Sequence, residues 1–212
     1  MYYWTKVDQG DRTEVVKILT FAKQNFNLEN EMLEIVNCTN SDGFTPLHLA
    51  SSEGHAPLIE ILIKFKAQVD ARTNNFRTPL HIACLRGNLS VIQALIQHGA
   101  DINAKDIDSN TPCHFCSEYG HRFCLKFLLT RNPYLFANNN EDKSAIDVAI
   151  SSEILNVSIT IIFSILIHNL LSSGIPRIYY EIEGFLEQEE GRLAAIVAEG
   201  CGWLGDQWHP IT

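Results

Sequence analysis

Apolar residues recur at helical spacing in short segments that are separated by polar turns. Three such segments, residues 58–63, 91–96 and 124–129, follow one another at a constant interval and carry apolar side chains at most positions. Apolar positions spaced by three and four residues are typical of helices that bury one face. The pattern predicts a chain built from many short helices rather than from a few long ones.

Each of these segments is preceded by another helical segment, and these earlier segments all start with the same short motif. Residues 45–50 have the sequence Thr-Pro-Leu-His-Leu-Ala, related motifs occupy 78–83 and 111–116, and a degenerate copy lies at 144–149. Threonine can cap a helix, and proline is tolerated next because its missing N–H would have no helical partner there. The leucine and the last alanine have the spacing of inward-facing positions. The histidine can bond the backbone of the adjoining turn and so join each unit to the next.

A 33-residue period built on T-P-L-H-x-A resembles the ankyrin-repeat family. The resemblance implies an all-α fold, an ankyrin-repeat solenoid of helix-turn-helix units with β-turn or hairpin loops, followed by an irregular C-terminal extension. It divides the chain into an irregular N-terminal repeat or cap at 1–39, ankyrin repeats at 40–152, an apolar segment at 153–173, and an acidic tail at 174–212 that is compatible with a longer chain.

The first unit is expected to be irregular. Apolar residues between positions 15 and 22 predict a helix that Asp11 or Thr13 can cap, and this helix resembles the second helix of an ankyrin unit. Residues 26–36 then lengthen the period by roughly ten residues, and residues 31–36 indicate one or two added helical turns. We expect this insertion in a loop between units.

The repeat pattern fails after Ala149. Residues 154–171 contain no carboxylate, Lys or Arg over eighteen positions, which is the lower limit for a membrane span. Asn156, Thr160, Ser164 and His168 recur every four residues, so the same segment also fits a helix packed on the repeats or on the tail. Its β-branched content permits a strand as well, and a partner surface is a further alternative.

Composition and charge narrow the class of partner. The net charge of −9 and the pI near 5.3 argue against nucleic-acid binding, because that requires a basic face. Six cysteines without a dense framework, and an N-terminus without the regions of a signal peptide, predict a reducing, cytoplasmic environment. Membrane association through 154–171 is the alternative.

One cluster has the residue types of a zinc site. Cys113, Cys116, His121 and Cys124 have nearly the spacing of a zinc knuckle, but the repeat already explains each of them, since the cysteines occupy positions that are Leu, Ala or Val in the other units. His48, His81 and His114 likewise occupy the histidine of the motif. Cys201, Asp206 and His209 could form a thiol nucleophile with its base, but no surrounding motif supports this. We therefore predict no metal, no cofactor and no catalysis.

The resemblance implies that a protein partner binds the concave surface, which is formed by the turn tips and the exposed sides of the first helices. Phe44, Arg77, Arg86 and Tyr119 are the predicted anchors, because aromatic residues and arginine dominate interface hot spots. The candidate partner-binding residues are Ser41, Asp42, Phe44, Glu53, Asn75, Phe76, Arg77, Leu85, Arg86, Ile107, Asp108, Asn110, Glu118, Tyr119 and Lys143.

The fourth turn position is unusual in the second regular unit. Gly43 occupies this position in the first regular unit, where a positive φ is expected, whereas Phe76 occupies it in the second. Either the backbone of this turn differs or the aromatic ring is there for contact, and we favour contact.

The sequence is also compatible with two other functions. The chain could be a membrane-associated ankyrin protein that is anchored by 154–171, with the repeats as its cytosolic recruiting head. It could also be the regulatory front of a truncated enzyme.

Overall fold

The computed structural model describes residues 2–25, 29–131, 133–151, 203–204 and 207–208. The chain divides into two compact units, Met1–Ile161 and Ile162–Thr212. The first unit holds all the helices of the described residues, and the second holds two short strands.

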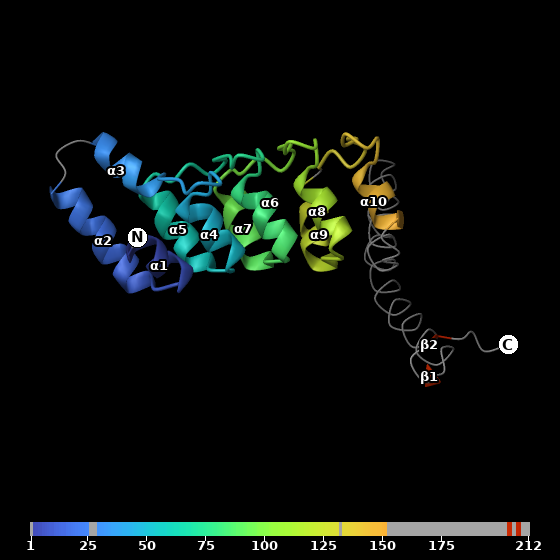
Figure 1. Ribbon diagram of the computed structural model, residues 1–212, viewed down its shortest axis with the longest axis horizontal. Coiled ribbons are helices and arrows are strands. Elements are labelled where there is room, and N and C mark those ends of the chain that lie inside the picture. Colours follow the sequence, from blue (N-terminus) through green and yellow to red (C-terminus); the bar gives the residue numbers. More distant parts are fainter. Residues whose placement is uncertain (1, 26–28, 132, 152–202, 205–206, 209–212) are drawn as a thin grey trace, which may run out of the picture. The chain divides into compact units, whose positions relative to one another are not determined.

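The helices of the first unit form two rows (Figure 1). Helices α4, α6, α8 and α10 pack in one row, while α5, α7 and α9 pack in the other, and α1 pairs with α2. This arrangement confirms the predicted helical repeat solenoid. The helices are α1 (Tyr2–Asp8), α2 (Arg12–Asn25), α3 (Glu29–Val36), α4 (Pro46–Ser52), α5 (Ala56–Lys64), α6 (Pro79–Arg86), α7 (Leu89–Gln97), α8 (Pro112–Glu118), α9 (Arg122–Leu129) and α10 (Ala145–Ser151).

The repeated motif starts the first helix of each regular unit as predicted. Thr45 caps α4, Pro46 is its first residue, and both Leu47 and Ala50 are buried. Alanine or cysteine at the last motif position leaves room for the neighbouring helix, because a larger side chain there would push the rows apart. The equivalent residues Ala83, Cys116 and Ala149 are also buried.

The motif histidine joins each unit to the next. The Nδ1 atom of His48 accepts the backbone N–H of Thr45 at 3.1 Å, and its Nε2 atom lies 3.0 Å from the carbonyl oxygen of Arg77. A carbonyl can only accept, so Nε2 carries the proton and the ring is neutral. The same pair of bonds recurs at His81 with Thr78 and Asn110, and at His114 with Thr111 and Lys143.

Burial keeps these rings neutral. It lowers the pKa of both His48 and His81 to about 4, although the hydrogen bonds to the carbonyls of Arg77 and Asn110 act in the opposite direction. Burial also lowers the pKa of His114. Each ring can therefore serve as acceptor and donor at neutral pH without carrying a charge.

A second set of side chains links the units at the start of the second helices. His121 Nε2 lies 3.0 Å from the carbonyl oxygen of Leu85, and Asn88 donates to the carbonyl oxygens of Ser51 and Ser52. Glycine follows the first helix of the second regular unit at this link. Gly87 has φ +73°, and a Cβ there would lie 2.5 Å from His121, so both the backbone and the packing require glycine.

The same link shows where the N-terminal unit is irregular. His55 Nε2 lies 2.9 Å from the carbonyl oxygen of Asp8, which is 47 residues away instead of the 36 between His121 and Leu85. The longer separation corresponds to the predicted insertion, and α3 confirms that part of it is helical. Asp11 accepts the backbone N–H of Glu14 and so caps α2, which settles the choice between Asp11 and Thr13. Helix α1 was not predicted.

Outside the repeats, strands β1 (Trp203–Leu204) and β2 (Gln207–Trp208) pair antiparallel, with Trp203 opposite Trp208. The sequence predicted no strand there. In the part of the chain that the structure describes, every helix is too short or too polar to cross a bilayer. The apolar segment 154–171 lies outside the described residues.

The neutral histidines predict a loss of stability in mild acid. Their folded pKa lies below the value of about 6.5 in an unfolded chain, so the unfolded state binds more protons as pH falls from 6.5 towards 4. These histidines do not lower the free energy of unfolding above pH 6.5. Below that pH it falls by on the order of 1 kcal/mol per histidine per pH unit. Urea unfolding at a series of pH values measures this slope.

Replacing one ring identifies the protons involved. The substitution His81→Asn should reduce the slope by about one proton, because asparagine does not titrate. The control Cys84→Ala removes a buried thiol of the same helix and should lower stability without changing the slope. An unchanged slope in His81→Asn would contradict the role of this ring.

Candidate functional site

The turns that precede the first helices are held by their own opening residues. The side chain of Asn40 accepts the backbone N–H groups of Asp42 and Phe44, at 3.0 and 2.9 Å. Asp106 and Asn139 make the equivalent pairs of bonds in later units, and Thr73 accepts the N–H of Arg77. These bonds close each turn independently of any partner, so the turn tips are preorganised.

Neighbouring turn tips are joined through their backbones. The N–H of Asn74 donates to the carbonyl of Asp42 at 3.0 Å, and that of Ile107 donates to the carbonyl of Asn75 at 3.0 Å. The N–H of Asn140 donates in the same way to Asp108 at 2.9 Å. The structure therefore brings the predicted residues Ser41, Asp42, Asn75, Ile107 and Asp108 together on adjacent tips, which we call the turn ribbon (residues 40–44, 73–77, 106–110 and 139–143).

The fourth turn position has positive φ in all four turns, including the turn of Phe76. Its φ is +58°, compared with +79° at Gly43. The alternative in which this turn has a different backbone is therefore wrong. A phenylalanine in this region is strained by about 1–2 kcal/mol relative to ordinary backbone. Its ring is about half exposed and lies under the Arg72 guanidinium, with 5.9 Å between Cζ and the ring centroid.

The fifth turn position is used mainly for internal contacts. The Phe44 ring lies 5.5 Å from that of His48, and Asn110 accepts the side-chain N–H of Asn139 at 2.9 Å. Lys143 pairs with Glu141 at 2.9 Å on the surface. These contacts leave the side chains only partly available to a partner, apart from the exposed Lys143.

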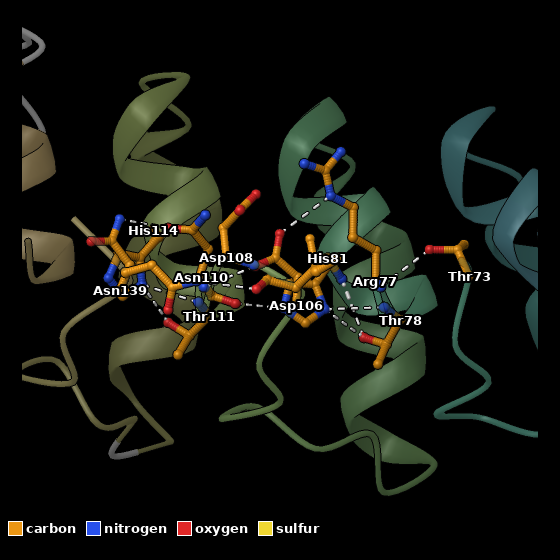
Figure 2. A network of polar contacts seen from close by, with 12 residues as sticks. Thr73, Arg77, Thr78, His81, Asp106, Asp108, Asn110, Thr111, His114 and Asn139 are labelled. Carbon is orange, nitrogen blue, oxygen red and sulfur yellow. Dashed lines mark hydrogen bonds and ion pairs between the residues drawn. The ribbon is translucent and has the colours of Figure 1, made fainter. Parts of the chain in front are cut away.

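Arg77 has the most extensive internal contacts of the predicted anchors. Its Nε atom lies 3.3 Å from Oδ2 of Asp106, whose side chain is fully buried, and its Cζ lies 4.9 Å from the centroid of the buried Phe115 ring. Figure 2 shows this network, in which Asp106 also receives the backbone N–H groups of Asp108 and Asn110. Arg77 therefore joins two units, and a partner that recruited it would have to compete with Asp106.

The remaining candidates lie at the C-terminal ends of the first helices. Glu53, Arg86, Glu118 and Tyr119 are exposed, whereas Leu85 is half buried. Arg86 donates to the Ser52 hydroxyl at 3.3 Å, and the Tyr119 ring stacks on that of His121 with centroids 6.4 Å apart. These residues are separated from the turn ribbon by a helix of seven or eight residues, about 10 to 12 Å long.

The cysteine and histidine clusters are part of the scaffold. Cys113, Cys116 and Cys124 are buried, as their repeat positions predicted, and burial raises the pKa of Cys113 to about 12. Such thiols are protonated at neutral pH and are poor metal ligands and nucleophiles. Among the described residues, no group of three or more His, Cys, Asp or Glu side chains is arranged to hold a metal ion. Cys201, Asp206 and His209 lie outside the described residues.

Several exposed aromatic residues were not among the candidates. Phe123, Tyr134 and Phe136 are each about two-thirds exposed or more, and all belong to the unit of α9 or the loop that follows it. Comparison of equivalent positions would have found them, because Ser90, Asp101 and Asn103 stand one period earlier. They lie outside the turns and the first helices, where the family resemblance implies partner binding.

Two family models match the chain. One, described as ankyrin repeats (3 copies), matches residues 5–106, and another, described as ankyrin repeats (many copies), matches residues 87–129. No curated protein matches the chain. The matched range begins in the N-terminal unit, in agreement with the packing of α1 on α4 and of α2 on α5.

The contacts of Arg77 predict that it contributes to stability while Arg86 does not. Arg77→Ala removes the counterion of a buried carboxylate, which should lower the free energy of unfolding by about 1–2 kcal/mol because Asp106 keeps its two N–H donors. Arg86→Ala is the control and should change it by less than about 0.5 kcal/mol. Denaturant titration of the two variants tests this, and equal effects would refute the difference.

Opposite outcomes are expected at the fourth turn position of the first two regular units. Gly43→Ala should destabilise by about 1–3 kcal/mol, because φ is positive and the new Cβ would lie 2.7 Å from the backbone nitrogen of Asn74. Phe76→Gly should not destabilise, because it removes the strain of a non-glycine residue. Thermal melting compares both, and a large loss in Phe76→Gly would show that the ring supports the fold.

Proposed function

Because the chain belongs to the ankyrin-repeat family, we propose that it binds a protein partner along the turn ribbon and the C-terminal ends of the first helices, without catalysis. Ankyrin repeats mediate protein–protein interaction.

The observation that carries the proposal is the exposed ring of Phe76 on a strained turn. Side chains in the left-handed region are tolerated where the surroundings or function require them. The ring is about half exposed, and the Arg72 guanidinium lies over it without covering it. Contact with a partner supplies a reason for a phenylalanine where the first regular unit has glycine.

Two further apolar side chains support this location. Ile107 is about half exposed and its backbone is bonded to Asn75, directly before Phe76. Tyr119 is equally exposed at the end of α8. Aromatic and large apolar residues that are exposed in the free protein are common anchors in protein interfaces.

The ribbon is also a rigid platform. Its turns are closed by side-chain bonds and joined to one another by backbone bonds. A preorganised surface loses little conformational entropy on binding, so more of the contact energy contributes to affinity.

The histidines and cysteines support a role without catalysis. Both ring nitrogens of His48 and His81 are used in links between units, and the thiols of Cys113 and Cys116 are buried. The described residues contain no observation that favours an enzyme front. The membrane anchor at 154–171 concerns residues outside the described part of the chain.

The test compares a turn variant with a variant in α9 and the loop that follows it. The first carries Phe76→Gly and Ile107→Asn, using residues that occupy these positions in other units, and the second carries Phe123→Ser and Phe136→Asn. Proteins captured by the full chain are identified by mass spectrometry, and the affinity of each for the three forms is measured by calorimetry. We expect the turn variant to weaken binding at least about tenfold and the second variant to preserve it.

The melting temperatures of both variants must stay close to that of the unchanged chain, so that lost binding does not reflect unfolding. A partner that binds the turn variant normally would place its site elsewhere and refute the proposal.

A further inference from the structure

Cations and exposed aromatic rings occur together in α9 and the loop that follows it, in a chain that is acidic overall. Residues 119–140 contain three cations, Arg122, Lys126 and Arg131, and no carboxylate. The whole chain carries −9, so the remainder, without these three cations, carries −12. The charge of this stretch is thus opposite to that of the rest of the protein.

Aromatic rings accompany these cations. Phe123, Tyr134 and Phe136 are 66%, 70% and 72% exposed. The Arg122 guanidinium lies 5.0 Å from the centroid of the Phe123 ring, and that of Arg131 lies 5.5 Å from the centroid of Phe127. We call Arg122, Phe123, Lys126, Arg131, Tyr134 and Phe136 the basic aromatic patch.

The geometry of the repeat points these positions towards solvent. Pro57 and Ser90 are the equivalents of Phe123, and Gln68 and Asp101 are the equivalents of Tyr134. All four are exposed, although a further unit follows theirs in the stack. Stacking of another unit after α9 would therefore leave Phe123 and Tyr134 exposed as well.

Phe136 replaces a residue that links units elsewhere. The side chains of Asn37, Asp70 and Asn103 accept the backbone N–H of Gln68, Asp101 and Tyr134, at 2.8, 3.1 and 2.8 Å. A phenyl ring cannot accept such a bond. The third regular unit thus has an exposed ring where the others have a structural acceptor.

We propose that the basic aromatic patch binds an anionic phospholipid surface. Aromatic rings enter the boundary between headgroups and acyl chains, while Lys and Arg approach the lipid phosphates and carboxylates. Lys126 favours a membrane over a protein, since lysine is depleted in protein interfaces and attracted to anionic lipids. The patch shares no residue with the turn ribbon and lies on α9 and the loop that follows it.

The charges around the patch set its strength. Glu118 and Glu141 border the stretch, and Asp101 lies in the neighbouring loop, where its carboxylate accepts the N–H of Asn103 at 2.9 Å. Each cation near an anionic bilayer raises the partition coefficient about fivefold. The remaining negative charge of the chain is screened beyond about 10 Å in 0.1 M salt, so binding requires the patch to face the membrane.

Flotation of the full chain with lipid vesicles tests the proposal. Vesicles of phosphatidylcholine and phosphatidylserine, mixed about 3:1, are compared with phosphatidylcholine alone. The unchanged chain should float with the mixed vesicles and not with phosphatidylcholine. Arg122→Gln, Lys126→Gln and Arg131→Gln together should reduce binding about a hundredfold.

Two further variants separate the contributions. Phe123→Ser, Tyr134→Gln and Phe136→Asn replace the rings with neutral residues found at these positions in other units, and should also weaken binding. Lys17→Gln, Lys64→Gln and Lys105→Gln together remove three exposed cations elsewhere and should reduce binding much less. Circular dichroism melting confirms that each variant is folded.

Three results would overturn the proposal. One is the absence of vesicle binding by the unchanged chain. Another is equal binding of the chain and its patch variants to both kinds of vesicle, which would place the lipid contact outside the patch. The third is capture of an acidic protein through the patch without any lipid binding. None of these outcomes bears on partner binding by the turn ribbon, which has its own variants.

Discussion

The stack depends on a neutral histidine that bonds backbone groups on both of its sides. Nδ1 of His48 closes the capping box of its own helix, and Nε2 reaches the carbonyl of Arg77 in the next turn. Only the neutral tautomer with the proton on Nε2 satisfies both groups. A charged ring would lose the acceptor and place a buried charge between units. Burial of the ring keeps it neutral, and only the neutral ring can make both bonds.

The fourth copy of the motif lacks the histidine that links one unit to the next. Asp147 stands where the histidine of the fourth motif is expected and bonds Ser144, within its own unit. Phe136 stands where Asn37, Asp70 and Asn103 accept a backbone N–H, and Ile154 stands one period after His121 without a polar group. In a solenoid each unit contacts mainly its neighbours, so these replacements remove side-chain types that position a neighbouring unit elsewhere in the stack. The copy at 144–149 is therefore degenerate in its linking residue as well as in its other motif residues.

The fold was largely predictable because the signals of each unit are local. The threonine cap, the proline and the inward leucine lie within one turn of helix, and the period repeats them. The role of Arg77 was not predictable in this way, because its partners Asp106 and Phe115 belong to the next unit of the stack. The sequence predicts Arg77 as a partner-binding anchor only because arginine is common in interface hot spots. The backbone of Phe76, in contrast, was predictable from the repeat. The equivalent residues Gly43 and Ser109 indicate a positive φ at this position, whereas phenylalanine by itself does not.

Departures from the repeat are the most informative residues for function in this chain. Scaffold positions are explained by the stack, so a change that the stack does not require needs another reason. Phe76 departs from glycine on the turn ribbon, while Phe123, Tyr134 and Phe136 are aromatic where the equivalent positions of other units are not. The first group belongs to the turns before the first helices, and the second belongs to a second helix and the loop after it. Since the two groups share no residue, the surfaces can be altered separately, and occupation of one does not require the loss of the other.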